Sequence, residues 1–128
     1  LIVGEIGPNS SLHYFSNRGG EPRELGPGTY GLSNHLLDTP WPKVSKGKAA
    51  FTTLVENGGF ASADLFSILA DETLADDDEL PATGVPYEAE KAISAIFIKT
   101  PGYGTRCSTV LTFDNNYDWD FDERVFVP

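Results

Sequence analysis

The apolar residues of this chain follow one spacing in its middle and another at both ends, and this contrast limits the fold most strongly. Residues 43–57 and 62–69 carry apolar side chains at intervals of three and four, the spacing of one helix face. The segments before residue 33 and after residue 95 carry continuous apolar and aromatic runs between glycine and proline turns, as strands do. Apart from residues 118–122, where Asp alternates with aromatic residues as in a half-buried strand, these runs do not alternate with polar residues. We therefore expect an α+β fold whose sheet is covered on both faces in a layered sandwich.

Turn and helix signals give the individual elements. A helix is expected over residues 43–57, because prolines suit the first helical turn and Gly58-Gly59 supplies a stop. Ser62 is a suitable N-cap for a second helix, and a short third helix is expected over residues 87–95. The expected strands are a hairpin of residues 1–6 and 12–15, then residues 29–32, 96–98, 108–113 and 119–127.

Charge and length exclude several classes of protein. The 128 residues suffice for one domain with one core. Nine basic against 19 acidic residues give a net charge of -10, which repels phosphate backbones, so nucleic acid is not an expected partner. One cysteine cannot form an internal disulfide, and no apolar stretch approaches the ~18 residues that span a bilayer. We therefore expect no transmembrane segment and a cytoplasmic location.

The sequence predicts no metal or cofactor. The acidic residues of 76–79 and 118–122 lack the loop glycine and the distant glutamate of a calcium loop. His13, His35 and Cys107 do not lie at the spacing of zinc or haem ligands. Among these three residues, His35 is the best placed to ligate haem if haem binds.

Polar residues at the end of the expected strand 29–32 form the first candidate site. Ser33-Asn34-His35 follow this strand directly, and sites are often built where strands end. Lys43, Lys46 and Lys48 then lie beside a helix start, where the helix dipole disfavours positive charge. Either an anion binds at this helix terminus or the lysines form a solvated surface cluster.

Arg106 and Cys107 are the second candidate pair. Arg106 stands between a glycine turn and a strand that reads as buried, so its guanidinium needs a fixed acceptor. That acceptor is either a substrate carboxylate or a protein carboxylate. Cys107 lies in the strand with no base nearby in sequence, so we expect a small buried thiol rather than a nucleophile.

The segment from Tyr30 to Val44, followed by Gly47-Lys48, resembles the signature of the NRDE family, the family of the Transport and Golgi organization 2 proteins. The resemblance covers almost the whole chain. Further matching segments are residues 80–85, 94–98, 103–106, 108–111 and 123–124.

The resemblance implies that residues 1–128 are the C-terminal half of a single domain about twice as long. The N-terminal half, with its cysteine and the Asn-Arg-Asp-Glu motif, is then the first partner of this chain. A chain that has no methionine and opens on Leu1 within an apolar run agrees with a missing segment. The implied fold is the four-layer αββα sandwich of N-terminal-nucleophile hydrolases. Half of such a sandwich exposes a sheet face and edge, so the fragment is expected to associate with copies of itself.

Two functions follow from the resemblance. In the first, the domain is an amidohydrolase that attacks a C–N amide bond with a cysteine of the absent half. Asn34 then stabilises the oxyanion, Arg106 orients the substrate or the thiol, and the fragment alone is inactive. In the second, the protein is a non-catalytic carrier of a small molecule such as haem or lipid, linked to Golgi organisation and secretion. The residues expected to contact a ligand are Ser33, His35, Trp41 and Lys43.

Overall fold

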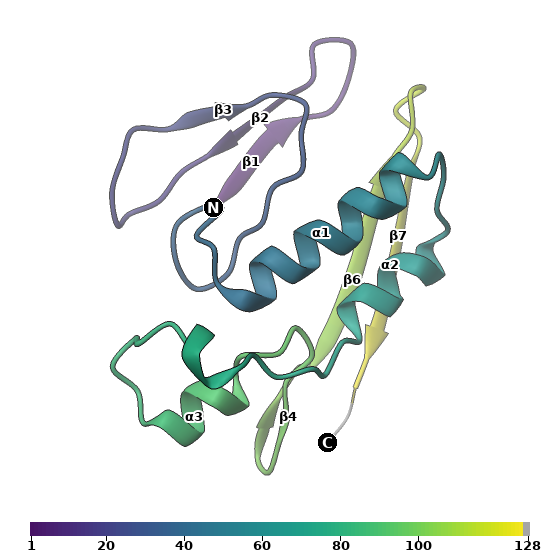
Figure 1. Cartoon of the computed structure of the whole chain (residues 1–128). Coiled ribbons are helices and arrows are strands. Elements are labelled where there is room, and N and C mark those ends of the chain that lie inside the picture. Colours follow the sequence, from purple (N-terminus) through teal and green to yellow (C-terminus); the bar gives the residue numbers. More distant parts are fainter. Residues whose placement is uncertain (127–128) are drawn as a thin grey trace.

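Two helices form the centre of the computed structural model, which describes residues 1–126 (Figure 1). Helix α1 spans Pro42–Glu56 and starts on a proline, and helix α2 spans Ser62–Leu69. Both confirm the helices predicted from apolar spacing. The expected N-cap is shifted by one residue, because Ala61 is the cap and its N–H donates to the Asp64 carboxylate (2.8 Å). No helix within residues 1–126 combines the length and apolar character needed to cross a bilayer.

The described strands form three small antiparallel sheets rather than one large sheet. Strands β1 (Ile2–Glu5), β2 (Ser11–Tyr14) and β3 (Arg23–Leu25) make the first sheet, which confirms the predicted N-terminal hairpin. The short strands β4 (Lys99–Thr100) and β5 (Tyr103–Gly104) make the second sheet. Strands β6 (Cys107–Phe113) and β7 (Trp119–Val125) make the third sheet. A short 3-10 helix η1 (Asp77–Glu79) and helix α3 (Tyr87–Ala92) precede β4.

Two predicted strands do not form. The backbone of residues 29–32 belongs to no ladder, and Gly31 instead bonds to Asp38. Residues 95–97 form a bend, and the N–H of Ile98 after it donates to the Thr105 hydroxyl (2.9 Å). An apolar run becomes a strand only where another strand lies beside it. The predicted strand at the C-terminus forms as β7, and the last two residues of that prediction lie outside the described residues.

The β6–β7 sheet is covered on one face only. Ser108 and Val110 are buried on the face against which α2 packs, where Phe66 of α2 is 1% exposed. The opposite face leaves apolar side chains open to solvent. These exposed side chains are Leu111, Phe113, Trp119, Phe121 and Val125. The prediction of a sheet covered on both faces is therefore wrong for this part of the chain. Residues 1–126 form a mixed α/β arrangement, in which the four-layer sandwich is not confirmed.

The open face leads to a first prediction. In isolation, residues 1–128 are expected to dimerise, aggregate or stay molten, because exposed apolar patches and sheet edges associate. Size-exclusion chromatography with light scattering, together with dye binding, checks this expectation. A compact monomer that unfolds in one cooperative transition would contradict it.

An ion pair between α1 and the end of α2 leads to a second prediction, on pH. Lys46 Nζ lies 2.5 Å from Asp71 Oδ2, and the Thr73 N–H also donates to Asp71 (2.9 Å). These bonds, chiefly the one from Lys46, lower the pKa of Asp71 from 3.8 to about 2. Because the folded pKa is depressed, the stabilisation is complete above pH ~4 and disappears as the pH falls towards 2. The stability difference between the wild type and Asp71→Asn should shrink over that interval, as urea titrations of the complete domain would show. A difference that is constant with pH would mean that the pair does not stabilise the fold.

Candidate functional site

A closed loop between residues 31 and 38 carries the predicted site residues at its tip. The Asp38 N–H donates to the Gly31 carbonyl (2.7 Å), and the Gly31 N–H donates to Asp38 Oδ1 (2.8 Å). Lys48 of α1 donates to the same oxygen (2.6 Å). These two donors, with Lys48 the stronger, hold the pKa of Asp38 below its usual value. The loop is therefore fastened at its base, and residues 33–36 project from it.

Close packing and one further hydrogen bond fix this loop on its neighbours. A Cβ atom added to Gly31 would lie 2.6 Å from Val44 Cγ1, so only glycine allows the loop to approach α1 this closely. On the other side, the Leu37 N–H donates to the Tyr14 hydroxyl of β2 (3.1 Å). The loop therefore bridges the first sheet and α1, which fixes the position of its tip.

Asn34 stands at this tip and touches three cavities. The Ser33 hydroxyl donates to Asn34 Oδ1 (3.4 Å). The Nδ2 group of Asn34 has no hydrogen-bond acceptor among residues 1–126, and the residue is exposed. Asn34 therefore presents unused N–H donors from a fixed backbone.

His35 next to it has one ring nitrogen in a hydrogen bond and one without a partner among residues 1–126. The Thr39 hydroxyl donates its only proton to the Leu36 carbonyl (2.8 Å), so it must accept a hydrogen bond from His35 Nδ1 (2.8 Å). In the neutral ring, Nε2 is then an acceptor. The ring also contacts Trp41, with centroids 5.6 Å apart and planes tilted by 43°. Within residues 1–126 no three His, Cys, Asp or Glu side chains converge as metal ligands would.

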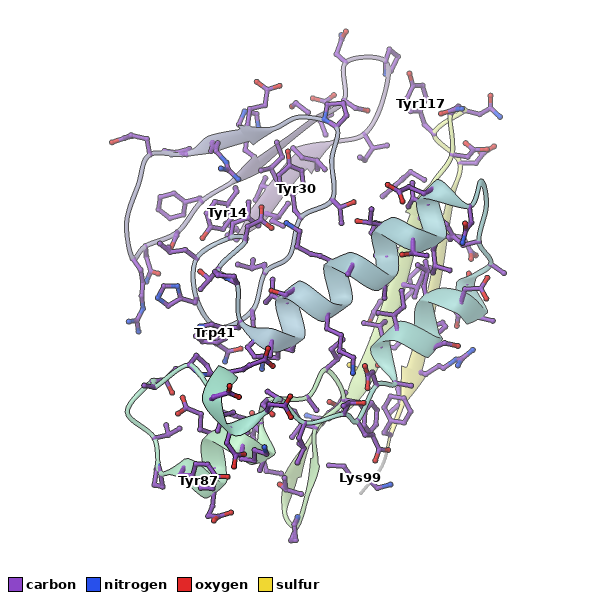
Figure 2. All side chains as sticks on the ribbon, in the orientation of Figure 1. Tyr14, Tyr30, Trp41, Tyr87, Lys99 and Tyr117 are labelled. Atoms are coloured by element: carbon purple, nitrogen blue, oxygen red, sulfur yellow. The ribbon has the colours of Figure 1, made fainter. Side chains whose placement is uncertain are left out.

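Four of the predicted residues surround one cavity of about 590 Å³, which we call the Asn34 cavity. Trp41 lies between α1 and the segment that carries α3, at one wall of this cavity (Figure 2). The lining residues are Arg18, Asn34, His35, Trp41, Pro42, Lys43, Pro81, Ala82, Thr83, Val85, Glu90, Ile93, Ser94, Ile98 and Tyr103. Ser33 lines two adjoining cavities instead. The structure therefore brings residues 34, 35, 41 and 43 together around one cavity.

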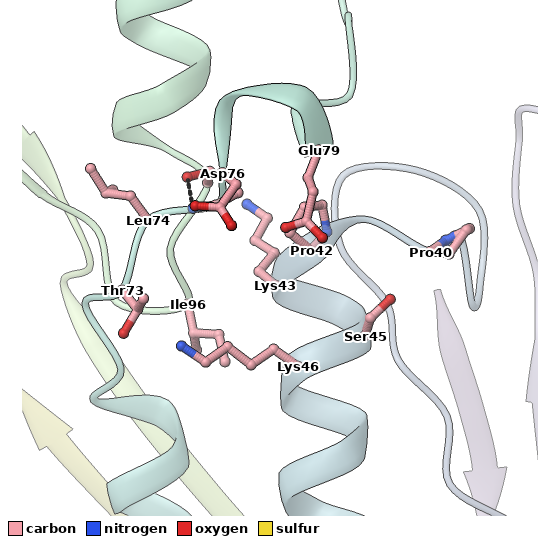
Figure 3. Close-up of a pocket in the computed structure, with 12 residues that line it drawn as sticks. Pro40, Pro42, Lys43, Ser45, Lys46, Thr73, Leu74, Asp76, Glu79 and Ile96 are labelled. Atoms are coloured by element: carbon pink, nitrogen blue, oxygen red, sulfur yellow. Dashed lines mark hydrogen bonds between the residues drawn. The ribbon is translucent and has the colours of Figure 1, made fainter.

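Lys43 forms a boundary between the Asn34 cavity and a second hollow of about 580 Å³. Its ammonium group donates to the Ile93 carbonyl (3.0 Å), and burial lowers its pKa. Asp76 and Glu79 line the second hollow and lie on the side towards which the Lys43 side chain extends (Figure 3). Lys43 therefore shares this hollow with two carboxylates of the chain.

Lys46 and Lys48 also have partners of their own, Asp71 and Asp38. The lysines of α1 thus hold separate segments against the helix. They form neither a single anion site nor a freely solvated cluster.

Arg106 is not brought to the Asn34 cavity. The residue is exposed before β6, its guanidinium has no acceptor among residues 1–126, and none of the cavities around Asn34 includes it. Cys107 is exposed as well, so the prediction of a buried thiol is wrong. Odd-numbered positions of β6 point to the uncovered face of the hairpin, which the sequence could not distinguish from the covered one.

Two charged residues of the cavity, Glu90 and Arg18, were not recognised from the sequence. Glu90 of α3 is 8% exposed and accepts hydrogen bonds from the N–H (2.8 Å) and the hydroxyl (2.5 Å) of Thr83. Arg18 lies in a turn after β2 and also lines the cavity. An acidic residue on the apolar side of a short helix was the one available signal for Glu90.

Comparison with known proteins identifies the family of this chain. The family model described as Transport and Golgi organisation 2 matches residues 1–128. A Transport and Golgi organization protein 2 homolog of Bos taurus is 41% identical over 120 residues, which covers 87% of this chain and 44% of the relative. The homologs of Homo sapiens and Mus musculus are each 36% identical over the same share of both chains. The chain thus spans less than half the length of these relatives. It belongs to the Transport and Golgi organisation 2 family.

Proposed function

We propose that this chain supplies the amide-binding side of an amidohydrolase of the N-terminal-nucleophile type. The observation that carries this proposal is the pair formed by Asn34 and His35 on the fastened loop. Asn34 offers N–H donors and His35 offers an Nε2 acceptor, and both line the Asn34 cavity. An amide group needs one donor for its carbonyl oxygen and one acceptor for its N–H. The two side chains are thus complementary to the group that such an enzyme cleaves.

The fixed loop suits the chemistry of amide cleavage. When a thiolate attacks the carbonyl carbon, negative charge collects on the carbonyl oxygen, and a donor that is already in place stabilises it most. The bonds from Gly31 and Lys48 to Asp38 hold Asn34 in place without help from a ligand. In this proposal the thiol comes from the N-terminal half of the domain, and its own α-amino group takes the thiol proton and later protonates the leaving amine.

The length of the relatives supports this division of the domain. Their chains carry more than half of their residues outside the matched part. We propose that residues 1–128 are the C-terminal half of one αββα domain, and that the N-terminal half covers the open face of β6–β7. Arg106, which is exposed and has no acceptor within the described part of the chain, is proposed to contact that half and to orient its thiol.

A carrier function is the second candidate, and the apolar wall of the Asn34 cavity favours it. Trp41, Val85, Ile93 and Ile98 line one space of about 590 Å³, within the range of small-molecule sites. The word "transport" in the names of the relatives agrees with this candidate. A carrier of haem or lipid would need this cavity and no reactive thiol.

Thiol labelling of the complete domain tests the first proposal against the second. Under the hydrolase proposal, iodoacetamide at pH ~6 should modify the N-terminal cysteine rapidly, because its pKa is lowered, and should abolish amide turnover. Mass spectrometry locates the modified residue. If labelling is slow, or if the labelled protein still turns over N-acyl p-nitroanilides, the nucleophile is not that cysteine. The carrier function would then be the better supported candidate.

A further inference from the structure

The backbone groups of β6 alternate in direction, and the hydrogen bonds at the two ends of its hairpin show which of them face β7. Phe126 donates to the Arg106 carbonyl (2.7 Å), and Asp114 donates to the Asp118 carbonyl (2.9 Å). Both pairs continue the β6–β7 register. Hydrogen-bonded and non-hydrogen-bonded pairs alternate along an antiparallel ladder. Even-numbered residues of β6 therefore bond to β7, and the N–H and C=O groups of odd-numbered residues point away from it.

The outward-pointing backbone groups of β6 open into a groove. Thr109 and Leu111 line a space of about 630 Å³ between β6 and α1, which we call the α1–β6 groove. Neither residue has a backbone hydrogen bond to anything else among residues 1–126. A strand edge with unsatisfied donors and acceptors is a template for another strand.

The opposite side of the groove is formed by residues 29–34, which include the predicted strand that does not form. Gly31 directs its N–H and C=O to Asp38. Tyr30 and Leu32, on either side of it, have no backbone partner among residues 1–126. This segment packs on α1 through Gly31, so it lies over the helix without belonging to a sheet.

We infer that a β-strand from the rest of the family domain inserts into the α1–β6 groove. It would pair with the edge of β6 through Thr109 and Leu111, and with Tyr30 and Leu32 on the other side. The floor of the groove includes Phe51, with other apolar side chains of α1 and α2, and suits the apolar face of such a strand. The inserted strand would join separate pieces into one sheet over the helices.

The length of the relatives and the residues of the groove both indicate that the inserted strand comes from the rest of the domain. More than half of each relative lies outside the part that matches this chain, which is ample for additional strands. Ser33 and Asn34 also line the groove. The inserted strand would therefore pass beside the proposed amide donor, which explains how a nucleophile on the other half could reach Asn34. The inference takes from the proposed function only that the domain continues beyond this chain.

Hydrogen exchange of the complete domain tests the inserted strand without reference to catalysis. The amides of Thr109 and Leu111 should exchange as slowly as those of Val110 and Thr112, which bond to β7 and serve as controls in the same strand. Fast exchange at 109 and 111 beside slow exchange at 110 and 112 would overturn the inference. Protection that disappears on dilution would overturn it too, because the edge would then pair with a second copy. If the complete domain showed no amide turnover but kept slow exchange at residues 109 and 111, the hydrolase proposal would be wrong and the inserted strand would still be supported.

A proline variant gives a second test. Leu111→Pro removes an N–H that β7 does not use, so without an inserted strand it should behave like Leu111→Ala. With the strand in place, Leu111→Pro should lower the urea midpoint of the complete domain clearly below that of Leu111→Ala. Equal midpoints for the two variants would overturn the inference.

Discussion

Replacing Asn34 by alanine in the complete domain is expected to lower kcat for amide hydrolysis by about 100-fold or more. The carbonyl oxygen gains its negative charge only after attack, so a donor fixed in advance stabilises the transition state more than the bound substrate. KM should therefore change little. Steady-state kinetics with a set of N-acyl p-nitroanilides would measure both quantities.

Ser33→Ala is the matched control for this prediction. Ser33 donates to the Asn34 oxygen over 3.4 Å, a long bond, so its loss should cost much less than the loss of the amide donor. Equal unfolding midpoints of both variants would show that the loop is intact. If Asn34→Ala turned over amides normally, Asn34 would not be the oxyanion donor. Under the carrier candidate, Asn34→Ala should instead change the affinity for the ligand, because Asn34 lines the cavity.

Replacing Phe66 by alanine is expected to cost about 3–5 kcal/mol in the free energy of unfolding of the complete domain. Phe66 is 1% exposed and is the largest fully buried side chain of the described residues. The cost is large because removing the buried ring leaves a cavity between α2 and β6. Urea titration followed by circular dichroism would measure the change.

Arg124→Gln separates the packing of Phe66 from its charge contact. The guanidinium carbon of Arg124 lies 3.9 Å from the centre of the Phe66 ring. Losing a contact of this kind at an exposed site costs about 0.5–1 kcal/mol. A Phe66→Ala variant no less stable than Arg124→Gln would mean that α2 is not the centre of the core.

Helices were predictable from this sequence because their signals are local. The spacing of apolar residues, the proline at the start of α1 and the glycines after it lie within one segment. The N-terminal hairpin and the β6–β7 pair were predictable for the same reason, since each closes over a short turn. Residues 29–32 and 96–98 have the composition of strands but no neighbouring strand to bond with. Composition alone could not reveal the missing neighbour.

The site was predictable to the extent that it is contiguous in the chain. Asn34, His35, Trp41 and Lys43 follow one another across one loop and a helix start, so their shared cavity is a local outcome. The position of Arg106 depends on the path of the chain between α3 and β6, and this path leaves Arg106 outside the Asn34 cavity. Glu90 joins the cavity from α3 through a contact that no spacing rule describes.

The base of the loop also has a consequence for how substitutions combine. Gly31 and Lys48 donate to the same oxygen of Asp38, whose own backbone has a positive φ of 60°. Two donors thus share one acceptor, and removing any one of the three residues removes part of what the other two contribute. Their individual effects on stability should therefore not add in double-mutant cycles. Variation at these three positions would then be tolerated mainly in combination, which makes residues 31, 38 and 48 a single unit of mutational constraint.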